Sequence, residues 1–126
     1  MLAGMKPVLK DGAFAFCTTN SLEAADKARP FALGWFAEDE GMTVILNQAD
    51  AERLGFDVGL PMAHIVLEVF SALDGVGLTA GVSSALADAG IPCNMMAAFH
   101  HDHIFVPATM ARRAISVLRE LQASSG

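Results

Sequence analysis

The stretch from His64 to Leu121 limits the fold most, because the spacing of its apolar residues changes from one segment to the next. Residues 65–70 form a short apolar run rich in β-branched types, so we predict a buried strand there. Apolar residues then recur at intervals of three and four over residues 78–89, and again over residues 110–121. This spacing predicts two helices with one apolar face each.

Two more strands are predicted between these helices, at residues 93–99 and 103–106. The short connection between them predicts an antiparallel hairpin, and Gly90 is suited to ending the helix that comes before. The order is βαββα, which an open sheet with both helices on one face accommodates. We therefore predict an α+β, ferredoxin-like fold, in which the strand at 65–70 neighbours both later strands.

A hairpin and the helix after it recur 60 positions apart. The segments TVIL and AER, within residues 43–53, match HIFV and ARR, within residues 103–113. Such a match is typical of an internal repeat. We predict a reduced N-terminal half over residues 1–61 and a complete domain over residues 62–126, folding as one cooperative unit because each half is small.

Several shorter elements are expected in the first half. Pro7 and the Asp11-Gly12 pair predict an irregular or edge segment, and the acidic turn Glu38–Gly41 predicts a hairpin. The segment TTNSLEAADKARP has a capping candidate in Ser21 but few apolar anchors, so both a short helix and a loop stay open. The other predicted elements are a strand at 13–18 and a helix at 47–54.

The run SALDGVGLTAGVSSALADAGIPCNMMAAF, followed by HHDHIFVP, resembles the second half of bacterial tandem ACT-domain proteins. These are small stand-alone chains, mostly of uncharacterised function. The segments KPVLKDGAFAFCTT and EGMTVIL resemble the first half of the same group. The resemblance implies tandem ferredoxin-like modules with antiparallel sheets, which in this class usually bind amino acids or other small effectors and regulate another activity.

Composition narrows the function classes. The formal net charge of −6 disfavours nucleic acid, since phosphate binding needs a cationic surface. A hydrophobic fraction of 53% favours a partner subunit, and we expect a homodimer.

No apolar run is long enough to span a bilayer and the N-terminus has no signal-peptide pattern, so we expect a cytoplasmic protein with no membrane partner. Cys17 and Cys93 are interpreted as reduced core residues.

The turn that precedes the first predicted helix is the first candidate ligand site. Its glycines let the backbone pass close to a ligand, and free amides at a helix start can hold a carboxylate. The resemblance implies effector binding near this turn, although the glycines can equally serve chain reversal and close packing alone. The candidate residues are Asp74, Gly75, Val76, Gly77 and Leu78.

Asn94 is the second candidate, because an amide in an apolar strand offers donors and acceptors to an amino-acid ligand. The alternative is a strand-edge asparagine that bonds only to backbone. We expect the ligand where the Asp74–Leu78 turn of one subunit or half meets a sheet edge near Asn94.

The segment His100-His101-Asp102-His103 contains metal-ligand residue types. Adjacent residues of a strand point to opposite faces, so we expect a surface hairpin and no structural metal. A metal-binding protein that uses this hairpin stays as a third alternative, with His100 and Asp102 as the most plausible pair and further ligands from another subunit.

No nucleophile elbow, phosphate loop, zinc-helix motif or dinucleotide fingerprint is present, so we predict no enzyme activity, catalytic residues or cofactor. The sequence favours a regulatory module that binds a small effector, an amino acid by resemblance. The alternative is a structural or protein-interaction module that binds no metabolite and recruits a partner through a sheet edge or helix face.

Overall fold

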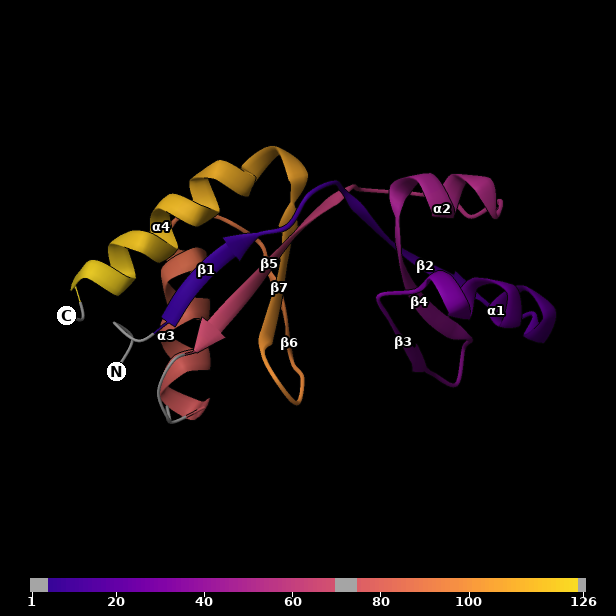
Figure 1. The fold of residues 1–126 in the computed structure, drawn as a ribbon, viewed down its shortest axis with the longest axis horizontal. Coiled ribbons are helices and arrows are strands. Elements are labelled where there is room, and N and C mark those ends of the chain that lie inside the picture. The colour runs from indigo at the N-terminus through magenta and orange to yellow at the C-terminus, as the bar shows by residue number, and fades with distance from the viewer. Residues whose placement is uncertain (1–4, 70–74, 125–126) are drawn as a thin grey trace. The chain divides into compact units, whose positions relative to one another are not determined.

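The computed structural model describes residues 5–69 and 75–124 (Figure 1). The chain divides into two compact units. We call residues 12–62 the inserted unit, and residues 1–11 together with 63–126 the split unit. Strand residues 5–9 thus group with the C-terminal part, and the expected domains, residues 1–61 and 62–126, stay a prediction.

The split unit has a four-stranded sheet with two helices. The strands lie in the order β1-β5-β7-β6, and β1 pairs antiparallel with β5, with Pro7 opposite Leu67. A proline is tolerated there because β1 is an edge strand. The bounds are β1 (Met5–Leu9), β5 (Met62–Val69), α3 (Gly75–Asp88), β6 (Asn94–Ala97), β7 (Asp102–Pro107), a 3₁₀ turn η3 (Ala108–Met110) and α4 (Ala111–Ser124).

The predicted βαββα order and ferredoxin-like architecture are confirmed. One detail is wrong, since β5 neighbours β7 but not β6. The other side of β5 is occupied by β1, whose Met5 is fully buried in the core of the split unit. The pairing joins segments far apart in sequence, and local hydrophobic spacing carries no information about it.

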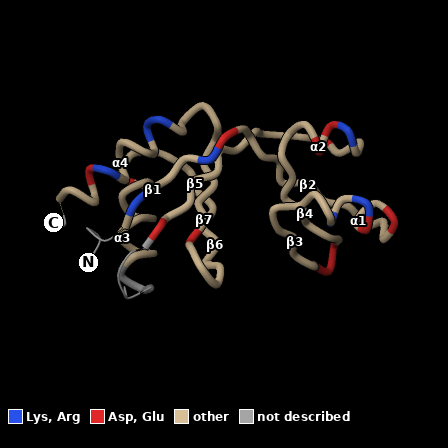
Figure 2. Tube along the Cα trace, viewed as in Figure 1, with Lys and Arg blue, Asp and Glu red and all other residues tan. Residues whose placement is uncertain are grey.

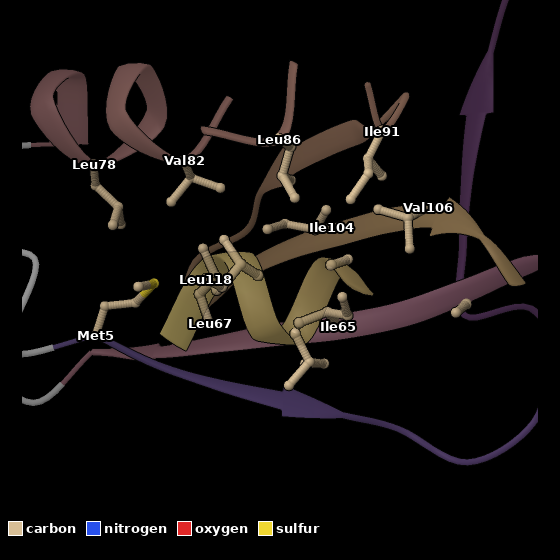
Figure 3. Packing of buried hydrophobic residues seen from close by; sticks show 13 residues of the cluster. Met5, Ile65, Leu67, Leu78, Val82, Leu86, Ile91, Ile104, Val106 and Leu118 are labelled. Atoms are coloured by element: carbon tan, nitrogen blue, oxygen red, sulfur yellow. The ribbon is translucent and has the colours of Figure 1, made fainter. Parts of the chain in front are cut away.

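One face of this sheet is covered by α3 and α4 (Figure 3). Leu78, Val82 and Leu86 follow one side of α3, and Gly90, with a φ of +74°, ends that helix as predicted. Burial of each large aliphatic side chain contributes about 1.5–3 kcal/mol. The cluster consists of Met5, Ala63, Ile65, Leu67, Leu78, Val82, Leu86, Ile91, Ile104, Val106, Ala114, Ile115 and Leu118.

The inserted unit repeats the βαββα order on a smaller scale, with the sheet order β3-β4-β2 and antiparallel pairing. Its strands β3 and β4 begin and end 60 positions before β6 and β7, so the repeat extends beyond the matched letters. The bounds are β2 (Phe14–Thr19), α1 (Leu22–Ala28), a 3₁₀ turn η2 (Arg29–Phe31), β3 (Gly34–Ala37), β4 (Met42–Asn47) and α2 (Gln48–Arg53).

Side-chain caps set the starts of both helices in the inserted unit. The Ser21 hydroxyl accepts a hydrogen bond from the Ala24 amide at 3.2 Å. The segment after Ser21 is therefore a short helix and not a loop. The Asn47 side chain accepts from the Asp50 amide at 2.8 Å and starts the second helix. The core beneath them is made of smaller residues than that of the split unit: Ala15, Cys17, Ala28, Val44, Leu46 and Ala51.

Both cysteines are free thiols. Cys17 is buried and Cys93 is half-buried against the core of the split unit. Burial raises the pKa of both thiols, so both stay protonated and unreactive near neutral pH. Across residues 5–69 and 75–124, no helix has the length and apolar character needed to cross a membrane.

Candidate functional site

The predicted turn site lies partly outside the described residues. Asp74 is not among them, whereas Gly75, Val76 and Gly77 are the first residues of α3. Leu78 is buried in the core, so only its backbone is available to a ligand.

Asn94 lies far from that turn within one chain. It is the exposed first residue of β6 and stands opposite Phe105, whose ring stacks on His64 at a centroid distance of 4.8 Å. His64 is near the start of β5, and the predicted turn follows the other end of that strand, Val69. At about 3.3 Å per residue the two places are about 16 Å apart. One copy of the split unit does not bring the two candidates together.

The histidine segment is divided between environments. His100 and His101 are exposed at the hairpin tip, while His103 is half-buried on β7. The Nδ1 atom of His103 lies 2.9 Å from the Nε2 atom of His64. The described residues contain no group of three histidine, cysteine or acidic side chains arranged to hold a metal ion. The absence of a bound metal stays a prediction, which elemental analysis of the purified protein tests.

His64 is a buried polar residue that no sequence pattern marked as a candidate. Burial lowers the pKa of His64 to about 4, with further contributions from His103 and Lys10. Burial also lowers the pKa of His103; His101 adds to this effect and Asp102 opposes it. Both rings are therefore neutral near pH 7. The sequence shows only a histidine next to the apolar residues of a predicted strand. This pattern is too common to identify a site.

A cavity of about 300 Å³ opens in the inserted unit, between the β2–α1 turn and the β3–β4 hairpin. This turn joins β2 to α1, which is the place in the βαββα order that the predicted turn has between β5 and α3. The cavity has the volume of a small-ligand site. Its lining consists of Thr19, Asn20, Ser21, Leu22, Ala25, Ala37, Glu38, Asp39, Glu40, Gly41 and Met42.

The β3–β4 hairpin, which lines one side of the cavity, carries a run of acidic residues (Figure 2), and the lining contains no lysine, arginine or histidine. Glu38 accepts a hydrogen bond from the Thr43 hydroxyl, which fixes one carboxylate. A Cβ at Gly41 would lie 2.8 Å from the Thr19 carbonyl oxygen, so glycine lets the hairpin close against β2. The acidic turn was interpreted from sequence only as a hairpin, and its approach to the β2–α1 turn was missed.

Apolar groups complete the lining of this cavity. Leu22 is largely exposed at its edge, and Met42 is half-buried. The Asn20 side chain adds an amide that can donate and accept hydrogen bonds. Carboxylates, an amide and aliphatic surface together suit a small molecule with an ammonium group and an apolar part.

Two family models match the sequence, both described as ACT domain, over residues 1–63 and residues 53–120. No curated protein matches it. A crystal structure of a Vibrio cholerae protein of unknown function, described as a possible transport protein, is similar at 35% identity with a TM-score of 0.85. That match covers 96% of this chain and 92% of the other.

Two further structures share the fold. A protein from Agrobacterium tumefaciens is 17% identical with a TM-score of 0.73, and the match covers 94% of this chain and 89% of that one. The ligand-free regulatory subunit of aspartate kinase from Thermus thermophilus is 13% identical with a TM-score of 0.65, covering 94% of this chain and 95% of that one. At these identities the two likenesses show a shared fold.

Proposed function

The chain belongs to the ACT-domain family, and from this premise we propose that it is a non-enzymatic regulatory protein that binds a small effector, an amino acid or a close analogue. ACT domains typically bind small-molecule effectors. The two family matches together extend over residues 1–120, and no catalytic domain lies within this sequence.

The cavity of the inserted unit is the observation that carries the proposal. The effector's ammonium group would lie against the acidic hairpin, where Asp39 and Glu40 supply carboxylates. Its side chain would contact Leu22 and Met42, and Asn20 would bond the remaining polar groups. The lining thus offers carboxylates to the ammonium group and aliphatic surface to the side chain, and the Asn20 amide is a donor for the carboxylate.

The turn at Asp74, Gly75, Val76, Gly77 and Leu78 stays as a second proposed place for the effector. Backbone amides at the start of α3 would hold a carboxylate, favoured by the helix dipole by about 0.3–1 kcal/mol at exposed sites. Asn94 would contribute from a neighbouring subunit, because within one chain it lies at the far end of the sheet. This arrangement requires the proposed homodimer.

A thermal-shift screen of amino acids and related metabolites tests the function. A ligand that binds only the folded protein raises the melting temperature, and the rise grows with ligand concentration. We expect at least one amine-containing metabolite to produce such a rise. If no member of a broad amino-acid panel stabilises the protein at millimolar concentration, the proposal is contradicted.

Variants then separate the two places by isothermal titration with the hit. Glu40→Gln changes an exposed carboxylate of the lining and should weaken binding about tenfold or more, since a charged hydrogen bond is worth about 1.5–3 kcal/mol. Leu22→Ala removes apolar contact from the edge of the cavity and should also weaken binding. Leu60→Ala is the matched control, an exposed leucine of the same unit outside the lining. Weakening by Gly77→Val or Asn94→Ala instead would assign the effector to the α3 turn.

The exposed edge of the inserted unit favours a protein-interaction module as the second candidate. Edge strand β3 exposes Trp35 by 52% and Phe36 by 69%, which is unusual for large aromatic side chains. Trp35→Ala and Phe36→Ala should leave effector binding intact but reduce association with a partner subunit or protein. Loss of effector binding in both would instead connect this edge to the ligand site.

A further inference from the structure

Two imidazoles face each other on β5 and β7, which are neighbouring strands of the split unit. His64 Nε2 and His103 Nδ1 are 2.9 Å apart, and the rings stack with centroids 5.1 Å apart and planes 18° apart. Phe105 also stacks on His64, and His64 is only 3% exposed. Alternation along β5 places His64 on the face opposite Ala63 and Ile65, which pack under the helices.

We propose that His64 and His103 form an acid-sensitive latch, which holds β5 to β7 while the pair is neutral and releases these strands when both rings are protonated. The proposal is independent of effector binding. It concerns the sheet of the split unit, whereas the cavity lies in the inserted unit.

The number of protons on the two facing nitrogens decides whether the hydrogen bond between the rings can form. In the neutral pair one ring donates its N–H and the other accepts with a lone pair. One additional proton can go to an outward nitrogen and leave this bond intact. A second additional proton puts an N–H on both facing nitrogens of two cationic rings, so the bond is replaced by repulsion. The folded pair therefore holds fewer protons than two solvated histidines.

The charged groups around the pair mostly oppose protonation. Lys10, just beyond β1, disfavours a cation at His64, and its backbone amide donates to the His64 carbonyl at 2.9 Å. His101 disfavours a cation at His103, whereas Asp102 favours one.

Two further charged residues belong to β5 and to its neighbour β1. Glu68 stands opposite Lys6 in the register of β5 and β1. From β6, which pairs with β7, Asn94 and Met96 bring no charge. Asp102 is thus the one acidic group among these residues that acts on the pair, and it acts on His103 alone.

Hydrogen exchange followed by mass spectrometry tests the latch. Below a pH of about 6.5 the opened strands bind protons that the closed pair does not bind. Each such proton shifts the equilibrium toward the opened strands by about tenfold for every pH unit. After correction for intrinsic exchange, β5 and β7 should open at least tenfold more between about pH 7 and about pH 4.5. Amides of β2 and β4 are the internal control and should change less.

Variants identify the groups responsible. His103→Gln keeps a hydrogen-bonding side chain but cannot titrate, so it should reduce the acid-dependent opening of β5 and β7. His100→Gln changes an exposed histidine outside the pair and should retain the wild-type response. The latch is excluded if β5 and β7 respond no more than β2 and β4, or if His103→Gln keeps the full wild-type response.

Nitrogen-15 NMR of the imidazoles in the unaltered protein supplies a second measurement that does not depend on the folding of any variant. His64 and His103 should titrate as a coupled pair, in two steps of which the second lies below pH 6.5. Two independent titrations near pH 6.5 would overturn the proposal.

Discussion

At the scale of single residues, two glycines shape the turns: Gly90 ends α3 with a φ of +74°, and Gly41 lets the β3–β4 hairpin approach β2. Gly90 was correctly predicted to end α3, because a positive φ is a local property that glycine signals. The side chain of Leu78 is in the core, as the helical spacing predicted, and its backbone role at the ligand site stays a prediction. His64 was missed because its partner, His103, comes from a distant strand.

Gly41 allows a prediction at this scale. Gly41→Ala should lower the free energy of unfolding by about 1–3 kcal/mol, because the new Cβ would meet the Thr19 carbonyl oxygen at 2.8 Å. Gly55→Ala is the control: its φ is also positive, at +83°, but nothing lies within 4 Å of the added carbon. Urea denaturation followed by Trp35 fluorescence measures both. Equal losses of unfolding free energy in the two variants would mean that the close approach of Gly41 to Thr19 does not affect stability.

At the scale of elements, hydrophobic spacing predicted α3, α4, β5 and the β6–β7 hairpin, because each signal lies within one segment. The short helix α1 stayed undecided from sequence, since its seven residues bury only Ala25 and Ala28 and depend on the Ser21 cap. The partner of β1 was also not predictable, because strand pairing is set by the assembled sheet. The cavity depends on the same kind of non-local approach, between a turn and a hairpin.

The amphipathic helix α4 gives the element-scale prediction. Leu118→Ala should reduce the free energy of unfolding by about 2–5 kcal/mol, because this side chain is fully buried among the sheet and α3 residues. Leu121→Ala, at a half-buried position on the same face, should cost less. Thermal and urea denaturation compare them. If Leu121→Ala cost as much as Leu118→Ala, the assigned inner face of α4 would be incorrect.

At the scale of the whole molecule, the tandem arrangement was predicted from the resemblance and the 60-position repeat, and the family is confirmed.

The homodimer stays a prediction. Light scattering after gel filtration should give about twice the 13.2 kDa of one chain. Trp35→Ala with Phe36→Ala should shift the mass toward that of a monomer if the β3 edge forms the contact. A concentration-independent monomer of the unaltered protein would contradict the predicted assembly.

The central claim is that a small effector binds in the inserted unit, and backbone NMR titration with the hit from the metabolite screen tests it most directly. We expect saturable shifts of amides at residues 19–22 and 38–42, which line the cavity, with smaller changes in α4. Glu40→Gln should weaken this binding, and Leu60→Ala should not. Saturable shifts confined to residues 75–78 and Asn94, or no saturable shifts at the cavity, would contradict the account.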